Sequence, residues 1–103
     1  MKEFCQIIIS TPSKEEADKI SNSLITKKLV AGSLIIHGPS RYWWEGKIVD
    51  KEYFNVQAFS LIKNKDKIIE DVKKNHSDKC PVIAFLEIDG NKEFLDWVKE
   101  VVK

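Results

Sequence analysis

Two strand–helix–strand units follow one another in this chain of 103 residues, and that order constrains the fold more than any other feature. Each unit has a helix too short to cover both faces of a sheet. We therefore expect an α+β fold with a four-stranded antiparallel sheet and both helices on one face, the ferredoxin-like βαββαβ sandwich. The strands are expected at residues 4–10, 33–36, 52–63 and 82–88, with helices at residues 14–28 and from Asn64 to Lys74.

Capping and turn residues define the boundaries of these elements. Ser13 lies three residues before Glu16, a capping-box spacing, and Asn64 and Asn91 are expected to cap the second and third helices. The Gly38-Pro39 pair is expected to end the strand at residues 33–36.

Two features are expected in addition to the ferredoxin-like core. Residues 41–44 and 47–49 flank Glu45-Gly46, which favours a tight hairpin. A C-terminal helix follows Asn91, with an apolar stripe formed by Phe94, Trp97, Val98 and Val101.

The strand at residues 52–63 carries large apolar groups on both faces. Phe54, Val56, Ala58 and Ile62 share one side, and Tyr53, Asn55, Gln57, Phe59 and Leu61 share the other. A half-exposed strand would have one polar face. We therefore expect something to cover part of each face, and association to be more favourable than a monomer.

Composition excludes several classes of function. Seventeen Lys and Arg against sixteen Asp and Glu give a net charge of +1, which provides no field for nucleic acid or an anionic membrane. Residues 55–59 do not form an RNA-binding aromatic motif, and no phosphate-loop, dinucleotide or hydrolase motif occurs. No secretory or membrane-spanning segment is recognised. The interpretation is a single domain over residues 1–103, cytoplasmic and not an enzyme.

The cysteines and histidines provide no obvious local metal motif. Cys5 and Cys80 lack metal-finger spacing and are expected to be reduced, and Cys80 is expected to be a small buried residue. Both begin strands that are antiparallel neighbours, so they should lie too far apart for a disulfide. His37 and His76 are too distant in sequence to form a local metal pair.

The densest group of unusual residues is the segment 41–47. It contains Tyr42, Trp43 and Trp44, followed by Glu45 and Lys47. Neighbouring strand residues point to opposite faces, so one Trp should face outward unless a partner covers it. Packing against a neighbouring subunit and stacking on a ligand both remain open, and the first is favoured because Trp and Tyr are common interface anchors.

Several segments resemble the CutA divalent-cation tolerance family over nearly the whole chain. They are residues 29–36, the segment from Tyr42 to Ile48, His76 with residues 81–84, and Gly90-Asn91 followed by residues 94–98. The resemblance implies a tight homotrimer in which the long hairpin extends sheets across subunit boundaries. It also implies a role in tolerance to copper and other divalent cations, without an established catalytic reaction.

The expected sites follow from this resemblance and its departures. Gly32 stands where the family commonly has a cysteine proposed as a copper ligand. His76 and Asp78 are therefore the expected ligands of Cu(II) or another divalent metal, bound weakly. Tyr42, Trp43, Trp44, Glu45 and Lys47 are expected at the inter-subunit cleft or interface. The alternative is a sensor that resembles the trimeric PII signalling proteins and binds a small molecule or nucleotide at the inter-subunit clefts.

Overall fold

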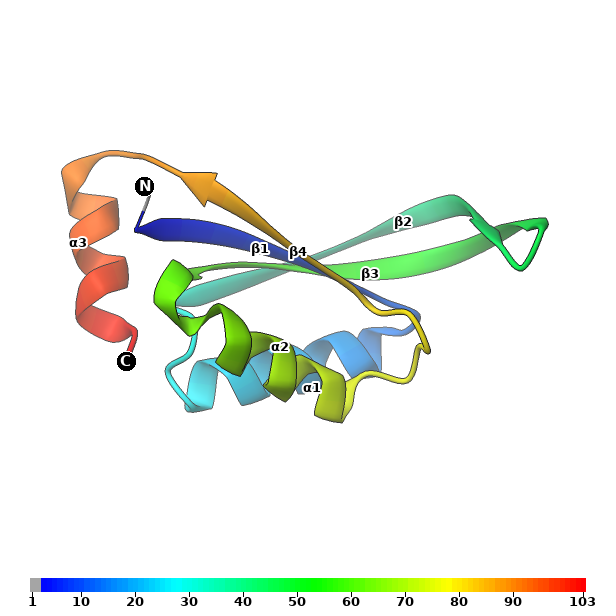
Figure 1. The fold of residues 1–103 in the computed structure, drawn as a ribbon, viewed down its shortest axis with the longest axis horizontal. Coiled ribbons are helices and arrows are strands. Elements are labelled where there is room, and N and C mark those ends of the chain that lie inside the picture. Colours follow the sequence, from blue (N-terminus) through cyan, green and yellow to red (C-terminus); the bar gives the residue numbers. More distant parts are fainter. Residues whose placement is uncertain (1–2) are drawn as a thin grey trace.

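The computed structural model describes residues 3–103 as a mixed α+β fold (Figure 1). The elements are β1 (Phe4–Thr11), α1 (Lys14–Thr26), β2 (Gly32–Trp44), β3 (Lys47–Leu61), the 3-10 turn η1 (Ile62–Asn64), α2 (Lys65–Asn75), β4 (Val82–Ile88) and α3 (Lys92–Val101).

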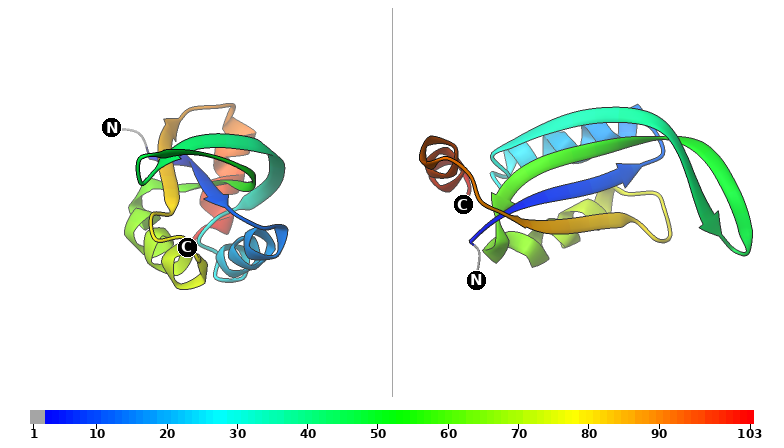
Figure 2. Two further views of the ribbon diagram at one scale, coloured as in Figure 1. Left: turned by 90° about the vertical axis from the view of Figure 1, so that its right-hand side faces the viewer. Right: turned by 90° about the horizontal axis from the view of Figure 1, so that it is seen from above.

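The four strands form one antiparallel sheet in the order β2-β3-β1-β4. Helices α1 and α2 lie side by side on one face, whereas α3 stands at one end of the sheet (Figures 1 and 2). This arrangement confirms the predicted ferredoxin-like fold.

The main core lies between the sheet and the two helices. Alternate residues of β1 and β3 point toward α1 and α2 because side chains alternate along a strand. The fully buried members include Ile7, Ile9, Val56, Ala58, Ile20, Leu24, Ile68 and Val72.

The opposite face of the sheet is covered only at one end. There α3 places Val98, with Val102 just beyond it, against Leu61, and the ring of Phe94 meets Phe59 edge-on at a centroid distance of 5.0 Å. Each face of β3 is thus partly covered, as its two-sided apolar pattern predicted.

The predicted boundaries of two strands were wrong. Gly38-Pro39 does not end a strand, because β2 continues to Trp44, and β3 begins at Lys47 and ends at Leu61 rather than spanning residues 52–63. The hairpin is therefore an extension of β2 and β3, not an extra element. β2 is an edge strand of the sheet, where a proline is tolerated if its nitrogen faces away from the neighbouring strand.

Residues 39–52 form a two-stranded arm that projects beyond the rest of the sheet (Figures 1 and 2). The pairing of β3 with β1 stops at Phe54 and Thr11, so no third strand supports the arm. At its tip Glu45 and Gly46 have φ values of 50° and 77°, the left-handed pair that a tight two-residue turn requires. The tight-hairpin prediction is confirmed.

Two of the predicted side-chain caps are absent. The amide of Glu16 donates to Ser13 Oγ at 3.2 Å, which confirms the first cap. Asn64 and Asn91 occupy N-cap positions without a side-chain cap bond; Asn64 is buried, and Asn91 Nδ2 donates to the Glu93 carboxylate at 3.2 Å. Helix α1 ends at Thr26, two residues before its predicted end.

Both cysteines are free, as predicted. Cys5 is buried opposite Glu87 of β4, while Cys80 precedes the other end of that strand. Cys80 is exposed, and the prediction of a small buried residue was wrong there, because the loop before β4 runs over the surface. Among residues 3–103, no helix is long and apolar enough to cross a membrane.

Candidate functional site

His76 lies directly after α2, and its side chain is fully buried. Its Nε2 is 2.7 Å from the Ser10 carbonyl oxygen of β1, and its Nδ1 accepts a hydrogen bond from the Asp78 amide at 3.1 Å. An amide N–H can only donate, so Nδ1 bears the lone pair and Nε2 carries the proton given to Ser10. Both ring nitrogens are engaged by the protein.

Glu16 fastens the same loop to α1. Its Oε2 accepts from the Ser77 amide at 3.0 Å and lies 3.3 Å from His76 Nδ1. Because that nitrogen has no proton in the tautomer above, the loop is held by the Ser77 bond rather than by an ion pair.

Asp78 connects the loop to the base of the arm. Its Oδ2 accepts from the Tyr53 hydroxyl at 2.9 Å, and the Tyr42 hydroxyl lies 3.4 Å from that of Tyr53. Burial, together with the hydrogen bonds to Tyr42 and Asp78, raises the pKa of Tyr53. The hydroxyl therefore remains protonated and continues to donate to Asp78.

The geometry of this loop does not fit a preformed metal site. A metal needs an imidazole lone pair, and that of His76 is buried and accepts the Asp78 amide. Within residues 3–103, no group of three or more His, Cys, Asp or Glu side chains is placed to hold a metal ion. His76 and Asp78 do lie together, but a cation could reach them only if the loop opened.

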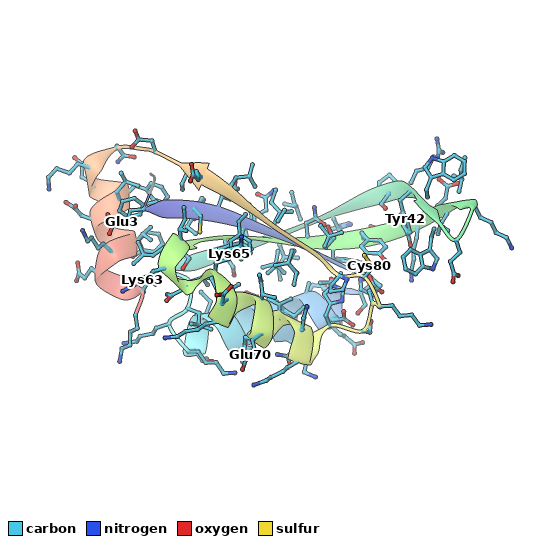
Figure 3. The ribbon with its side chains drawn as sticks, in the orientation of Figure 1. Glu3, Tyr42, Lys63, Lys65, Glu70 and Cys80 are labelled. Carbon is cyan, nitrogen blue, oxygen red and sulfur yellow. The ribbon has the colours of Figure 1, made fainter. Side chains whose placement is uncertain are left out.

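The predicted aromatic residues gather on the arm, where Figure 3 labels Tyr42. Trp43 pairs with Ile48 across the two strands, and 72% of its surface is exposed. Trp44 is also exposed, on the opposite face of the arm. Glu45 and Lys47 are exposed at its tip. Within a single chain, the arm presents apolar aromatic surface to solvent on both faces.

A histidine–carboxylate pair on β2 and β3 was not predicted. His37 Nδ1 lies 2.5 Å from Glu52 Oε2, and the imidazole stacks on Phe54 at a centroid distance of 5.1 Å and an angle of 24°. A sequence signal was present: His37 precedes and Glu52 follows Glu45-Gly46 at similar distances, so a long hairpin would bring them together. That signal was missed because Gly38-Pro39 was taken as the strand end.

A second unpredicted cluster joins the two helices. Asp71 of α2 is buried and accepts from Ser23 Oγ at 2.8 Å and from Lys27 Nζ. Beside it lies a shallow groove of about 220 Å³ that is also lined by Leu29 and Lys67. No local sequence signal indicates this cluster, since Asp71 is more than 40 residues away from both Ser23 and Lys27.

The comparison with protein families matches residues 5–101 to the CutA1 divalent ion tolerance protein. A divalent-cation tolerance protein CutA of Archaeoglobus fulgidus is 39% identical over 98 residues, which cover 94% of this chain and 96% of that protein. The corresponding protein of Thermus thermophilus is 33% identical and covers 91% of this chain and 93% of its own length.

Solved structures show the same similarity. The A. fulgidus structure, described as a periplasmic divalent cation tolerance protein, has a TM-score of 0.93 at 38% identity and covers 97% of this chain and 99% of its own. A CutA1 structure from Oryza sativa has a TM-score of 0.94 at 29% identity and covers 99% of this chain and 95% of its own.

Proposed function

Because this chain belongs to the CutA1 divalent ion tolerance family, we propose that it contributes to tolerance of copper and other divalent cations as a homotrimer that binds them only weakly. We propose no catalytic reaction for it. A cytoplasmic location stays a prediction, since one similar protein is described as periplasmic.

The uncovered face of the sheet is the observation that carries the assembly proposal. Leu34 and Ile36 of β2 are exposed on it, as are Val82 and Leu86 of β4, and 59% of the Leu34 surface is open. Strand register places Ile8 of β1 between them. The apolar side chains lie on both sides of Gln57 and Asn55 of β3, and exposed apolar surface of this extent marks an association site.

The arm supports the same proposal. A two-stranded ribbon has little stability of its own in water, and the exposed Trp43, Trp44 and Ile48 add unfavourable apolar surface. Tyr42, Trp43, Trp44, Glu45 and Lys47 are therefore proposed to contact a neighbouring subunit. Such contact would cover both the apolar tip and part of the open sheet face.

The donor groups support weak binding of cations. Gly32 supplies no thiolate, and the buried lone pair of His76 would have to be released before it could ligate a metal. Because opening the loop costs free energy, it makes the binding of a cation weaker. A cation at His76 and Asp78 would thus bind with low affinity.

Light scattering of the purified protein tests the assembly. We expect three times the chain mass of 11.9 kDa, and a species near 11.9 kDa at micromolar concentration would contradict the trimer. Trp44→Ala should lower the melting temperature if Trp44 is covered between subunits, because a buried Trp→Ala change costs roughly 3 to 5 kcal/mol. Ile25→Ala, an exposed residue of α1 away from the arm, is the matched control.

The cation role is tested in cells that lack their own member of this family. Expression of this chain should raise the copper concentration at which growth stops, and the Trp44→Ala variant should not if the assembly is required. No change with the wild-type chain would contradict the tolerance role. A thermal-shift screen with metals and nucleotides separates this role from that of a nucleotide sensor, because a ligand that binds the folded state raises its melting temperature.

A further inference from the structure

Asp89 and Gly90 lie in the exposed loop that connects β4 to α3 (Figure 1). The Gly90 amide donates a hydrogen bond to Asp89 Oδ1 at 2.9 Å. Because the carboxyl carbon Cγ is bonded to Oδ1, the Gly90 nitrogen also lies close to that carbon. A bond between these two atoms would close a five-membered ring.

The Gly90 nitrogen is accessible for such a reaction. Glycine has no Cβ, so no side chain blocks the approach of its nitrogen to the preceding carboxyl group. Among residues 3–103, the Gly90 amide donates to the Asp89 side chain and to no backbone carbonyl. The nitrogen therefore does not have to leave a helix or a strand in order to react.

The ring that these atoms can form is a succinimide. The Gly90 nitrogen bonds to Asp89 Cγ, and the hydroxyl of the carboxylic acid leaves with the amide hydrogen as one molecule of water. A second water then opens the ring at either carbonyl. Opening at Cγ restores aspartate, whereas opening at the former backbone carbonyl gives isoaspartate. The two steps consume and release only water.

The other aspartates of the chain do not combine these features. Asp89 is the only aspartate that glycine follows in the sequence. Asp78 also lies in a loop, but Lys79 follows it, and its Oδ2 accepts a hydrogen bond from the Tyr53 hydroxyl. The remaining aspartates lie in helices or in β3: Asp18, Asp50, Asp66, Asp71 and Asp96.

Isoaspartate at residue 89 would disturb the packing of α3. It lengthens the main chain by one carbon, because the backbone then runs through Cβ and Cγ. Gly90 lies so close to α3 that a Cβ there would be 3.0 Å from Phe94 Cδ2. The Phe94 ring in turn packs on Phe59 of β3. A longer connection thus shifts the contact through which α3 covers its end of the sheet.

We propose that Asp89–Gly90 is a modification site at which the chain forms isoaspartate as it ages, and that this change loosens α3 from the sheet. The isoaspartyl residue carries its α-carboxylate as a side group. The aged chain is therefore a substrate for a carboxyl methyltransferase that recognises this group. The proposal is independent of the cation role.

Peptide mapping of the aged full-length protein tests the modification. The folded protein is incubated at neutral pH beside the same chain unfolded in guanidinium chloride, and isoaspartate is detected by enzymatic methylation. We expect product at residue 89 and none at Asp78, with a folded rate within about tenfold of the unfolded rate, because only misplaced reacting groups cost about a hundredfold.

Asp89→Glu is the matched control. It keeps the carboxylate, but its extra methylene requires a six-membered ring, so the aged variant should contain no such product. If the unfolded wild-type chain converts while the folded protein forms no isoaspartate at residue 89, or forms it about a hundredfold more slowly, the modification site is overturned. Equal product in Asp89→Glu would overturn it as well.

Amide hydrogen exchange tests the effect on α3. The isoaspartyl form is separated by chromatography and compared with fresh protein. Exchange should be faster at residues 92–101 and unchanged in α1, and aged Asp89→Glu should match fresh Asp89→Glu. Unchanged exchange of α3 in the isoaspartyl form would overturn the loosening while the modification site stands.

Discussion

The indole of Trp97 covers Gly32. A Cβ added at Gly32 would lie 3.0 Å from Trp97 Cη2, closer than nearly all such contacts in proteins. The space beside residue 32 is thus filled from α3 by an aromatic ring. A side chain at residue 32 would require the Trp97 ring to shift by a few tenths of an ångström.

Gly32→Ala should therefore move Trp97. The ring is 44% exposed and can swing outward, so we expect a stability change of less than about 1 kcal/mol, partly offset by the lost flexibility of glycine in the unfolded chain. The measurement is Trp97 fluorescence and denaturant unfolding in a Trp43→Phe/Trp44→Phe background. Gly38→Ala, where the Cβ meets nothing, should stabilise by roughly 0.4 to 1 kcal/mol without changing the emission. Unchanged emission in Gly32→Ala would contradict the contact.

Asp71→Ala should destabilise the pairing of α1 with α2. The change leaves Ser23 and Lys27 without their buried acceptor, which costs about 1 to 3 kcal/mol. Asp18→Ala removes an exposed carboxylate that pairs with Lys14, and should change stability by no more than about 0.5 kcal/mol. Urea unfolding at one fixed protein concentration measures the free energy of unfolding of both variants. Equal losses in the two variants would show that buried Asp71 contributes no more to stability than an exposed carboxylate does.

Tyr53→Phe should loosen the loop that contains Asp78. The carboxylate loses the hydroxyl that donates at 2.9 Å, so we expect a loss of about 1 to 2 kcal/mol. Amide hydrogen exchange at residues 76–80 should speed up. Tyr42→Phe is the control, since its hydroxyl lies 3.4 Å from that of Tyr53 and contributes little. The same exchange rates in both variants would argue against a role for the Tyr53–Asp78 bond.

Cys5 should make the folded state sensitive to alkali. Burial raises the pKa of its thiol from 9.0 to about 11, so folding favours the protonated thiol. The contribution of the protonated thiol to the free energy of unfolding is fully present below pH 9.0. It is lost as the pH rises from 9.0 to about 11, which lowers the free energy of unfolding by about 2 to 3 kcal/mol. The free energy of unfolding measured across this range should fall less steeply for Cys5→Ala than for the wild type.

Thiol titration gives an independent check of the same burial. At neutral pH the native protein should present one reactive thiol per chain, that of exposed Cys80, and the denatured protein two. Cys80→Ser should leave the native protein without a reactive thiol. Rapid reaction of Cys5 in the native Cys80→Ser variant would show that β1 opens more readily than its buried position indicates.

The sheet and its helices were predictable because burial leaves a period in the sequence. Ile7 and Ile9 alternate with half-buried neighbours, and Ile20 and Leu24 recur at helical spacing. The continuous course of β2 was not predictable by the same means. In a strand with neighbours on both sides, Gly38-Pro39 would indicate a turn, because proline cannot donate to either neighbour. Only the strand order shows that β2 is an edge strand, where proline is tolerated.

The candidate site was predictable in its residue types and not in its geometry. His76 and Asp78 were named from the family resemblance, but the burial of His76 depends on Ser10 and Glu16, which are 66 and 61 residues away from their partners in the chain. His37 and Glu52 meet only because the register of the long hairpin brings them together. The contacts of His76 leave no local pattern in the sequence, whereas that of His37 with Glu52 could have been found only with the correct length of the hairpin.

Pro39 also has a consequence for the single chain. Trp44 and Lys47 flank the two-residue turn and form a hydrogen-bonded pair. Backbone nitrogens alternate in direction along β2, so those at an odd number of positions before Trp44 point to the outer edge of the sheet. Pro39 is one of these residues. An unpaired edge is a template on which other chains can stack into fibrils, and proline removes one donor from the middle of this row. The residue that is compatible with the long strand is thus also a guard against open-ended aggregation.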